Sequence, residues 1–197
     1  MEPSIEDLRN NYKRFSDDKL IQLATTDAAG LRPEAIQVLQ EEIKDRGLST
    51  DLLKGIDVQR KEINEKELLE FCEIIRKQPC PICGSALFKL NATLTGNVVS
   101  FLIFTNYEKK LVIACPDCLR KANKNAMIKS AFLGWWGIPW GIIRTIQSFI
   151  FNNKMSKQTQ LEEPNENLIG FVLERVGTIE ANKLDNARLQ SLIKYLN

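Results

Sequence analysis

Four of the five cysteines in this 197-residue chain form two pairs with the spacing of a metal-binding knuckle. Cys80 and Cys83 flank Pro-Ile, and Cys115 and Cys118 flank Pro-Asp. Two CxxC pairs typically hold one Zn2+ ion through four thiolates, which leaves no open coordination position for catalysis. The pattern predicts one structural zinc ion, with a rubredoxin-like iron or iron–sulfur site and a thioredoxin-type redox pair as alternatives. Cys72 lies in a helical run and is predicted to be a buried apolar residue.

The chain contains no histidine. A Ser-His-Asp triad, a Cys-His nucleophile and zinc ligand sets that include histidine are therefore excluded. Neither a GxxxxGK[ST] nor a GxGxxG motif occurs. The paired glutamates Glu41–Glu42 and Glu162–Glu163 have no sequence neighbours that argue for acid–base work. We expect that the protein is not an enzyme, and no motif indicates a small-molecule substrate.

Composition and periodicity predict an α+β protein. Apolar residues make up 44% of the chain and charged residues 26%, which are ordinary values for a globular protein. Residues 1–77 have the capping residues and the three- and four-residue apolar spacing of a small helical unit that leads into the first knuckle. A polar linker is expected at residues 153–165, followed by C-terminal helices at residues 166–197. We expect these helices to pack on the N-terminal helices, with a groove-binding face for a partner as the alternative.

Between the two cysteine pairs, β-branched and aromatic residues predict a three-stranded zinc ribbon. The predicted strands are Ala86–Leu94, Val98–Thr105 and Leu111–Cys115. A turn is expected at Thr95–Asn97, where glycine and asparagine favour chain reversal. Such a ribbon would bring Cys115 back beside Cys83. Together with the helical segment after it, the ribbon forms the second predicted domain, residues 78–152.

The sequence after the second knuckle is apolar and rich in tryptophan. Ser130 to Ile143 contains no charged residue and includes all three tryptophans. This run is shorter than the roughly 20 apolar residues that a membrane-spanning helix needs. Glycines and Pro139 predict a bent helical hairpin, whose corner either packs on the core or a partner or lies at a membrane surface. The candidate contact residues are Trp135, Trp136, Ile138 and Trp140.

Positive charges gather around the same region. Between Lys109 and Lys154 there are eight basic residues and one acidic residue, Asp117. They could bind the phosphates of nucleic acid or anionic lipid headgroups, or they could offset the zinc–thiolate cluster and the acidic stretch Glu62–Glu73. The net charge of +2 does not by itself indicate a polyanionic partner. The candidate anion-binding residues are Lys109, Lys110, Arg120, Lys121 and Lys124.

In this order, the motifs CPxCG, strands, CPxCL, a basic helix and GWWGIPWGII resemble an uncharacterised bacterial zinc-ribbon family. The stretches Phe15–Leu20, Pro33–Ala35 and Glu41–Gly47 are similar to a short bacterial helical module of the form SDEEL…PEA…EELxxRG. The two resemblances cover roughly residues 12–50 and 78–152. They imply zinc at the four paired cysteines, and they imply no catalytic residue.

We therefore predict a non-enzymatic zinc-ribbon adaptor of the bacterial cytosol that binds a protein partner of unknown identity. A peripheral contact with the inner face of the membrane is a further expectation. The opening Met1-Glu-Pro-Ser is acidic and polar, unlike a signal peptide, and CxxC pairs suit a reducing compartment. Two alternatives stay open: a nucleic-acid-binding ribbon that uses the basic residues, and a rubredoxin-like iron or redox protein.

Overall fold

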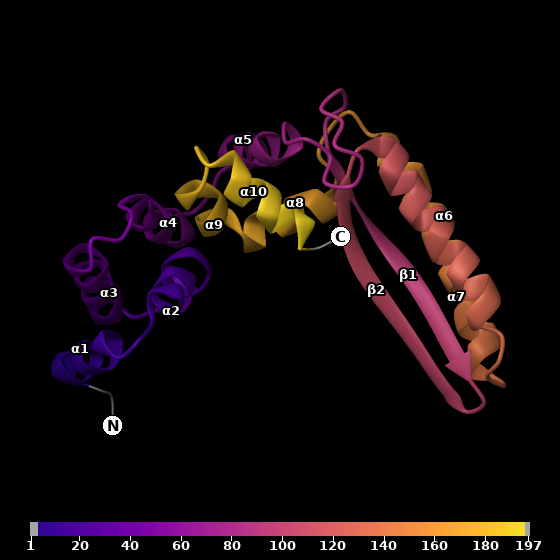
Figure 1. Ribbon diagram of the computed structural model, residues 1–197, viewed down its shortest axis with the longest axis horizontal. Helices are drawn as coiled ribbons and strands as arrows, with labels where there is room; N and C mark the ends of the chain where they lie inside the picture. The colour runs from indigo at the N-terminus through magenta and orange to yellow at the C-terminus, as the bar shows by residue number, and fades with distance from the viewer. Residues whose placement is uncertain (1–3, 196–197) are drawn as a thin grey trace. The chain divides into compact units, whose positions relative to one another are not determined.

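The structure is a computed structural model that describes residues 4–195. These residues form an α+β protein that is mostly helical and has one two-stranded antiparallel sheet (Figure 1). The chain divides into two compact units. Unit 1 comprises the described residues up to Phe71 together with Phe171–Asn186. Unit 2 comprises Cys72–Gly170 and the described residues from Ala187 onward.

Unit 1 is helical, and its helix ends follow from capping. Ser16 accepts a hydrogen bond from the backbone N–H of Lys19 at the start of one helix, and Pro33 occupies the first turn of the next. Gly47 ends that helix with φ of 65°, a left-handed conformation that glycine permits. The elements of unit 1 are α1 (Ile5–Lys13), α2 (Asp17–Gln22), η1 (Leu23–Asp27), η2 (Ala28–Gly30), α3 (Pro33–Asp45), α4 (Asp51–Arg60) and α9 (Val176–Ala181).

Arg46, which belongs to the helical module motif, links three parts of unit 1. Its guanidinium donates hydrogen bonds to three backbone oxygens at and just beyond the end of α1. It also forms ion pairs with Asp17 at 2.9 Å and Glu42 at 2.8 Å. A planar guanidinium can serve all of these acceptors together, whereas an ammonium group cannot. The Asp–Arg pair of the module therefore has a structural role.

Replacing Arg46 by lysine is expected to lower the free energy of unfolding of unit 1 by about 1–2 kcal/mol, because partly buried backbone acceptors lose their donor. Chemical denaturation followed by far-UV circular dichroism measures this loss. Arg9→Lys is the matched control, since the Arg9–Glu41 ion pair is solvent-exposed and contributes little. Equal losses in the two variants would contradict the assigned role.

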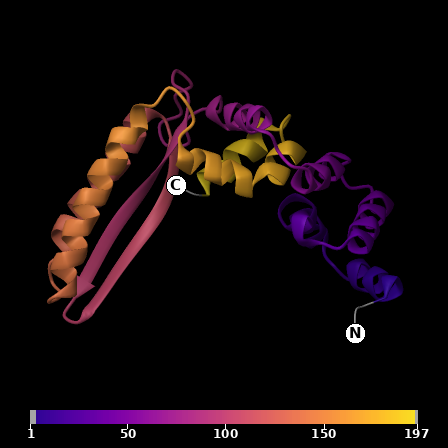
Figure 2. The ribbon, with the colours of Figure 1, turned by 180° about the vertical axis from the view of Figure 1, so that it is seen from behind.

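Unit 2 is built on a long β-hairpin. Strands β1 (Asn91–Phe101) and β2 (Phe104–Ala114) pair antiparallel, in a register that runs from Asn91 opposite Ala114 to Phe101 opposite Phe104. Helices α6 (Pro116–Leu133) and α7 (Trp140–Lys157) run along one side of this hairpin, and both contact β1 and each other (Figures 1 and 2). The other elements, some of which continue into unit 1, are α5 (Glu65–Arg76), η3 (Gln158–Gln160), α8 (Glu166–Glu174) and α10 (Asn186–Lys194).

The predicted three-stranded ribbon is a two-stranded one in residues 4–195. The expected turn at Thr95–Asn97 instead lies within β1, where it pairs with residues 108–110 of β2. Gly96 is required there for space, because a methyl group at this position would lie 2.8 Å from the hydroxyl oxygen of Tyr107. The chain reverses at Leu102 and Ile103 instead, and Leu102 adopts φ of 51°.

The helical hairpin that follows departs from the prediction in its length. α6 ends at Leu133, and α7 continues to Lys157, beyond the predicted domain end at residue 152, and a short 3-10 turn follows. Residues 153–157, placed in the predicted linker, are therefore helical. The predicted C-terminal helical run comprises three helices, α8, α9 and α10. Leu196, an apolar residue of that run, lies outside the described residues.

Candidate metal centre and apolar tip

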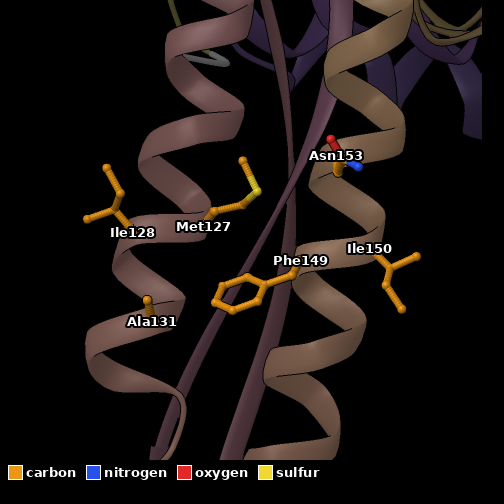
Figure 3. A pocket seen from close by; sticks show the side chains of 6 residues that line it. All are labelled: Met127, Ile128, Ala131, Phe149, Ile150 and Asn153. Atoms are coloured by element: carbon orange, nitrogen blue, oxygen red, sulfur yellow. The ribbon is translucent and has the colours of Figure 1, made fainter.

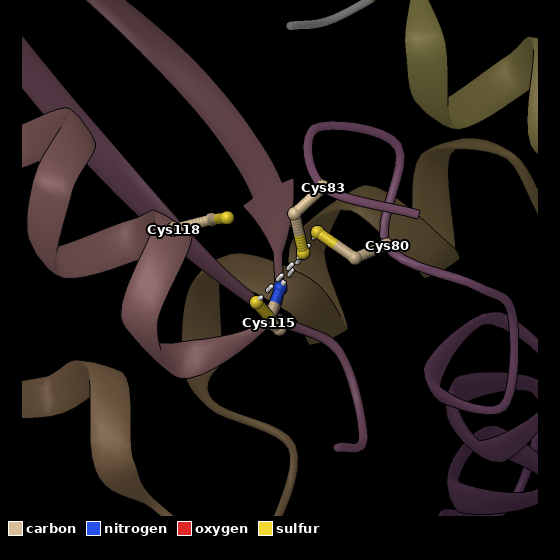
Figure 4. Close-up of side chains that lie close together, drawn as sticks. All are labelled: Cys80, Cys83, Cys115 and Cys118. Carbon is tan, nitrogen blue, oxygen red and sulfur yellow. Dashed lines mark hydrogen bonds between the residues drawn. The ribbon is translucent and has the colours of Figure 1, made fainter. Parts of the chain in front are cut away.

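The four paired cysteines converge at the end of the β-hairpin where β1 begins and β2 ends. Cys80 and Cys83 lie on the turn after α5, Cys115 follows β2, and Cys118 lies in the first turn of α6 (Figure 4). Their four Sγ atoms all lie within 4.8 Å of one another, and those of Cys83 and Cys115 are 3.7 Å apart. Four sulfurs at tetrahedral positions around zinc would be about 3.8 Å apart. The cluster could therefore bind a metal ion.

A short loop presents the first pair of sulfurs. The backbone N–H of Gly84 donates to the Cys80 oxygen at 2.8 Å, and the N–H of Cys80 donates to the Ser85 oxygen at 2.9 Å. Gly84 has φ of 74°, and no atom outside its chain neighbours lies within 4 Å of where a side chain would begin. The left-handed backbone at this position, and not a shortage of space, therefore favours glycine.

Burial and hydrogen bonds shift the cysteine pKa values in opposite directions. Burial raises the pKa of Cys115 and Cys118, and neighbouring sulfurs raise that of Cys118 further. Burial acts the same way on Cys80, but backbone N–H groups of Cys115, Cys83 and Ile82 donate to its sulfur and lower its pKa to about 7. The N–H of Cys115 lies 3.4 Å from that sulfur. A bound dication would supply the positive charge that several buried thiolates need.

Cys72 stands outside this cluster. It is fully buried in α5, and burial raises its pKa to about 11. A thiol in such surroundings stays protonated and unreactive near neutral pH. The prediction that Cys72 is a buried apolar residue is therefore confirmed.

The far end of the hairpin carries exposed apolar side chains, which we call the apolar tip. Ile103 at the strand turn is 92% exposed, and the predicted contact residues Trp136 and Ile138 are 69% and 76% exposed. The N–H of Leu102 donates to the Trp136 oxygen at 3.0 Å, which holds the strand turn against the tryptophan corner. The tip consists of Phe101, Leu102, Ile103, Phe104, Phe132, Leu133, Trp135, Trp136, Ile138 and Trp140.

Sequence reasoning found the tryptophan half of the tip and missed the strand half. Phe101–Phe104 was placed in the interior of a predicted strand, where large apolar side chains normally pack. The signal that could have identified a turn is weak, because Leu102 and Ile103 are poor turn residues. The other sign that Phe101–Phe104 is not an ordinary strand segment is that four large apolar residues follow one another without polar alternation.

Above the tip, α7 has mainly polar side chains toward the hairpin and isoleucines outward, whereas α6 is mixed and buries Leu119 and Ala126 as well as Ser130. Ser130, Ser148 and Asn152 are fully buried. Ser130 accepts from the backbone N–H of Val98, and Ser148 donates to the backbone oxygen of Gly96. The exposed apolar residues on the same helices are Ile128, Ile142, Ile143, Ile146 and Ile150. The polarity of α7 is the reverse of that expected for a helix whose outer face is in water.

An apolar groove of about 500 Å³ runs between α6 and α7. Figure 3 shows Met127 and Phe149 between the two helices and Ala131 on the near face of α6, while Ile128 and Ile150 point outward. Asn153 contributes polar atoms to the lining. The groove was not predicted from the sequence, because it depends on how the two helices pair.

The predicted anion-binding residues lie on two elements. Lys109 and Lys110 are exposed on β2, and the Lys109 ammonium lies 4.8 Å from the ring centre of Phe151. Arg120 forms an ion pair with Asp117 inside α6. Lys121 and Lys124 are exposed on the same helix.

Comparison with protein-family models, with curated proteins and with solved structures finds no match for this chain. Within residues 4–195, no helix has both the length and the apolar character that crossing a bilayer requires. The fold and the site together define an α+β protein with a four-cysteine cluster that could bind a metal ion.

Proposed function

We propose that this protein is a non-enzymatic zinc-ribbon adaptor of the bacterial cytosol, which binds a protein partner while its apolar tip contacts an anionic membrane surface. We also propose that it belongs to the bacterial zinc-ribbon family that its motifs resemble. The observation that carries the membrane contact is the exposure of the apolar tip beside a basic helix. Aromatic and aliphatic side chains flanked by lysines favour the interface of an anionic bilayer.

Zinc is the proposed metal because four thiolates close a tetrahedral shell. A structural ion there would link the loop after α5 to the junction of β2 and α6, two segments that are far apart in the sequence. Iron in the same ligand set would give a coloured, redox-active protein. Metal analysis and the visible absorption spectrum of the purified protein distinguish the two: we expect one zinc per chain and no visible colour.

Vesicle co-sedimentation tests the membrane contact. The protein is expected to bind vesicles that contain phosphatidylserine, to bind neutral vesicles weakly, and to lose part of its binding in high salt. Replacing Lys121 and Lys124 by glutamine should weaken binding to the anionic vesicles by about 5-fold per residue, because each lysine near the surface contributes about 1 kcal/mol. Lys44→Gln in α3 of unit 1 is the control and should leave binding unchanged.

Nucleic acid is the competing partner, because Lys109, Lys110 and the basic residues of α6 could contact phosphates. Apolar side chains make up the tip itself, and this favours lipid. Tight binding to DNA or RNA that falls steeply with salt, together with no binding to anionic vesicles, would replace the proposed function with a nucleic-acid-binding ribbon.

A further inference from the structure

We infer that the apolar tip does not stop at the membrane surface but inserts into the acyl-chain region of one leaflet, with the outer faces of α6 and α7 in contact with lipid. This inference rests on the proposed function. It goes further because it names acyl chains as the partner of the tip and states a depth of insertion.

The first argument is the reversed polarity of α7, which continues onto α6 only at Ile128 and near the tip. Ile146 and Ile150 on α7 and Ile128 on α6 are exposed, while serine and asparagine side chains fill the space toward the hairpin. Exposing this much apolar surface to water is costly, at about 25 cal/mol for each square ångström. Acyl chains would cover the surface without requiring a matching protein shape.

The second argument is that Ser130, Ser148 and Asn152 on the inner side find partners inside the protein, whereas the buried hydroxyl of Thr145 has none among the described residues. Ser148 and Asn152 both donate to the backbone oxygen of Gly96, and Asn152 accepts from the Gly96 N–H. Ser130 and Ser148 also lie within hydrogen-bond distance of each other, at 3.1 Å. A segment inside a bilayer must satisfy its polar groups in this way, because no water is available there.

The third argument is length. Asn97 to Tyr107 contains no charged residue, and the first charged residue on β2, Glu108, is five residues from Ile103 in the strand turn, or about 16 Å. On α7 the apolar outer face extends from Trp140 to Ile150, which is about 15 Å. Half of a hydrocarbon core about 30 Å thick is also about 15 Å. Both estimates match the depth of one leaflet.

The fourth argument is where the charges stand. Lys124 lies nine residues before the end of α6, about 14 Å from the corner, and Lys154 lies about 21 Å from the start of α7. These residues would meet the headgroups when the tip is inserted. Lys129 and Arg144 lie closer to the tip, and their long side chains can extend toward the headgroups. Arg144 already donates to the Gln147 side chain.

A second copy of the chain fits the same surface less well. A copy packed along the helices would cover the groove and the outer isoleucines, yet it would leave the strand turn with Ile103 in water. The apolar surface continues from the helices around the corner onto that turn. Fluid acyl chains can cover all of it.

Depth-dependent fluorescence quenching tests the inference in the full-length, zinc-loaded protein. Vesicles of phosphatidylserine and phosphatidylcholine would carry bromine at shallow or deep acyl positions. All three tryptophans lie in the corner, so we expect deep bromines to quench more strongly than shallow ones. Ile103→Asp should weaken vesicle binding by about a hundredfold, because a carboxylate would enter the hydrocarbon.

Leu87→Asp is the matched control, since Leu87 is 87% exposed near the cysteine cluster and far from the tip along the hairpin. It should bind vesicles like the unaltered protein, and both variants should keep their metal. Binding with only shallow quenching and no effect of Ile103→Asp would overturn insertion and leave the proposed function standing. No vesicle binding at all, or a lipid-free dimer that Ile103→Asp dissociates, would overturn both.

Discussion

Replacing Cys115 by serine is expected to abolish metal binding and to lower the free energy of unfolding of unit 2 by about 5 kcal/mol. Cys115 contributes one of four sulfurs that lie within 4.8 Å of one another. Loss of that sulfur leaves three ligands for the ion. For a chain of this size the midpoint of thermal unfolding would fall by about 10–20 °C. Metal analysis and a thermal melt with and without chelator measure both effects.

Serine is the informative replacement because Cys115 is the N-cap residue of α6. Serine is itself a favourable N-cap, so the start of α6 is preserved. The decrease in the free energy of unfolding then results from the loss of the metal ion. Cys72→Ala is the control: Cys72 is buried outside the cluster, and its replacement should cost about 1 kcal/mol and leave one metal per chain. A Cys115→Ser protein that keeps a full metal complement would refute the ligand assignment.

The candidate metal centre could be predicted because its chemistry is local. Within each pair, two residues lie between the cysteines, and a tight turn is sufficient to direct both sulfurs of the pair at one point. What brings the two pairs together is the hairpin, and here the sequence misleads. Thr95–Asn97 has turn residues in the middle of a strand, because Gly96 is selected by the nearby Tyr107 ring and not by chain reversal.

The arrangement of unit 1 could not be predicted in full, because it depends on contacts between residues that are far apart in the sequence. Residues 171–186 belong to it although more than a hundred residues of chain separate them from α4. Gly55 and Gly177 allow the backbones of α4 and α9 to approach, since a methyl group on Gly55 would lie 2.9 Å from the Gly177 oxygen. Two isolated glycines far apart in a sequence do not indicate that they meet. Within this unit α9 packs on α4.

The apolar tip is a third feature that could be predicted from the sequence only in part. Tryptophans near glycine and proline were predicted either to pack on the core or a partner or to lie at a membrane surface, and their exposure depends on tertiary structure. The outward-facing isoleucines of α7 gave no indication of their exposure, because an apolar stripe on a helix normally predicts the side that packs on the core. Which side faces the hairpin is decided by Ser148 and Asn152, whose hydrogen bonds to β1 depend on tertiary structure.

A substitution on the inner polar side of α7 is expected to have the second large effect on stability. Replacing Asn152 by alanine is expected to lower the free energy of unfolding of unit 2 by about 3 kcal/mol. The Asn152 amide accepts from the Gly96 N–H at 2.9 Å and donates to the Gly96 oxygen at 2.8 Å, in a fully buried position. Alanine leaves the N–H without its partner in a place that water does not reach.

Asn153→Ala provides the matched control, because Asn153 is the next residue on the same helix and is exposed. The change in helix propensity is the same for both variants, and the control should alter the free energy by no more than about 0.5 kcal/mol. Denaturant unfolding of the zinc-loaded protein measures the difference, and hydrogen exchange at the Gly96 amide locates it. If the two variants unfold at the same denaturant concentration, the hydrogen bonds of Asn152 do not hold α7 against β1. The outward placement of the isoleucines would then need another cause.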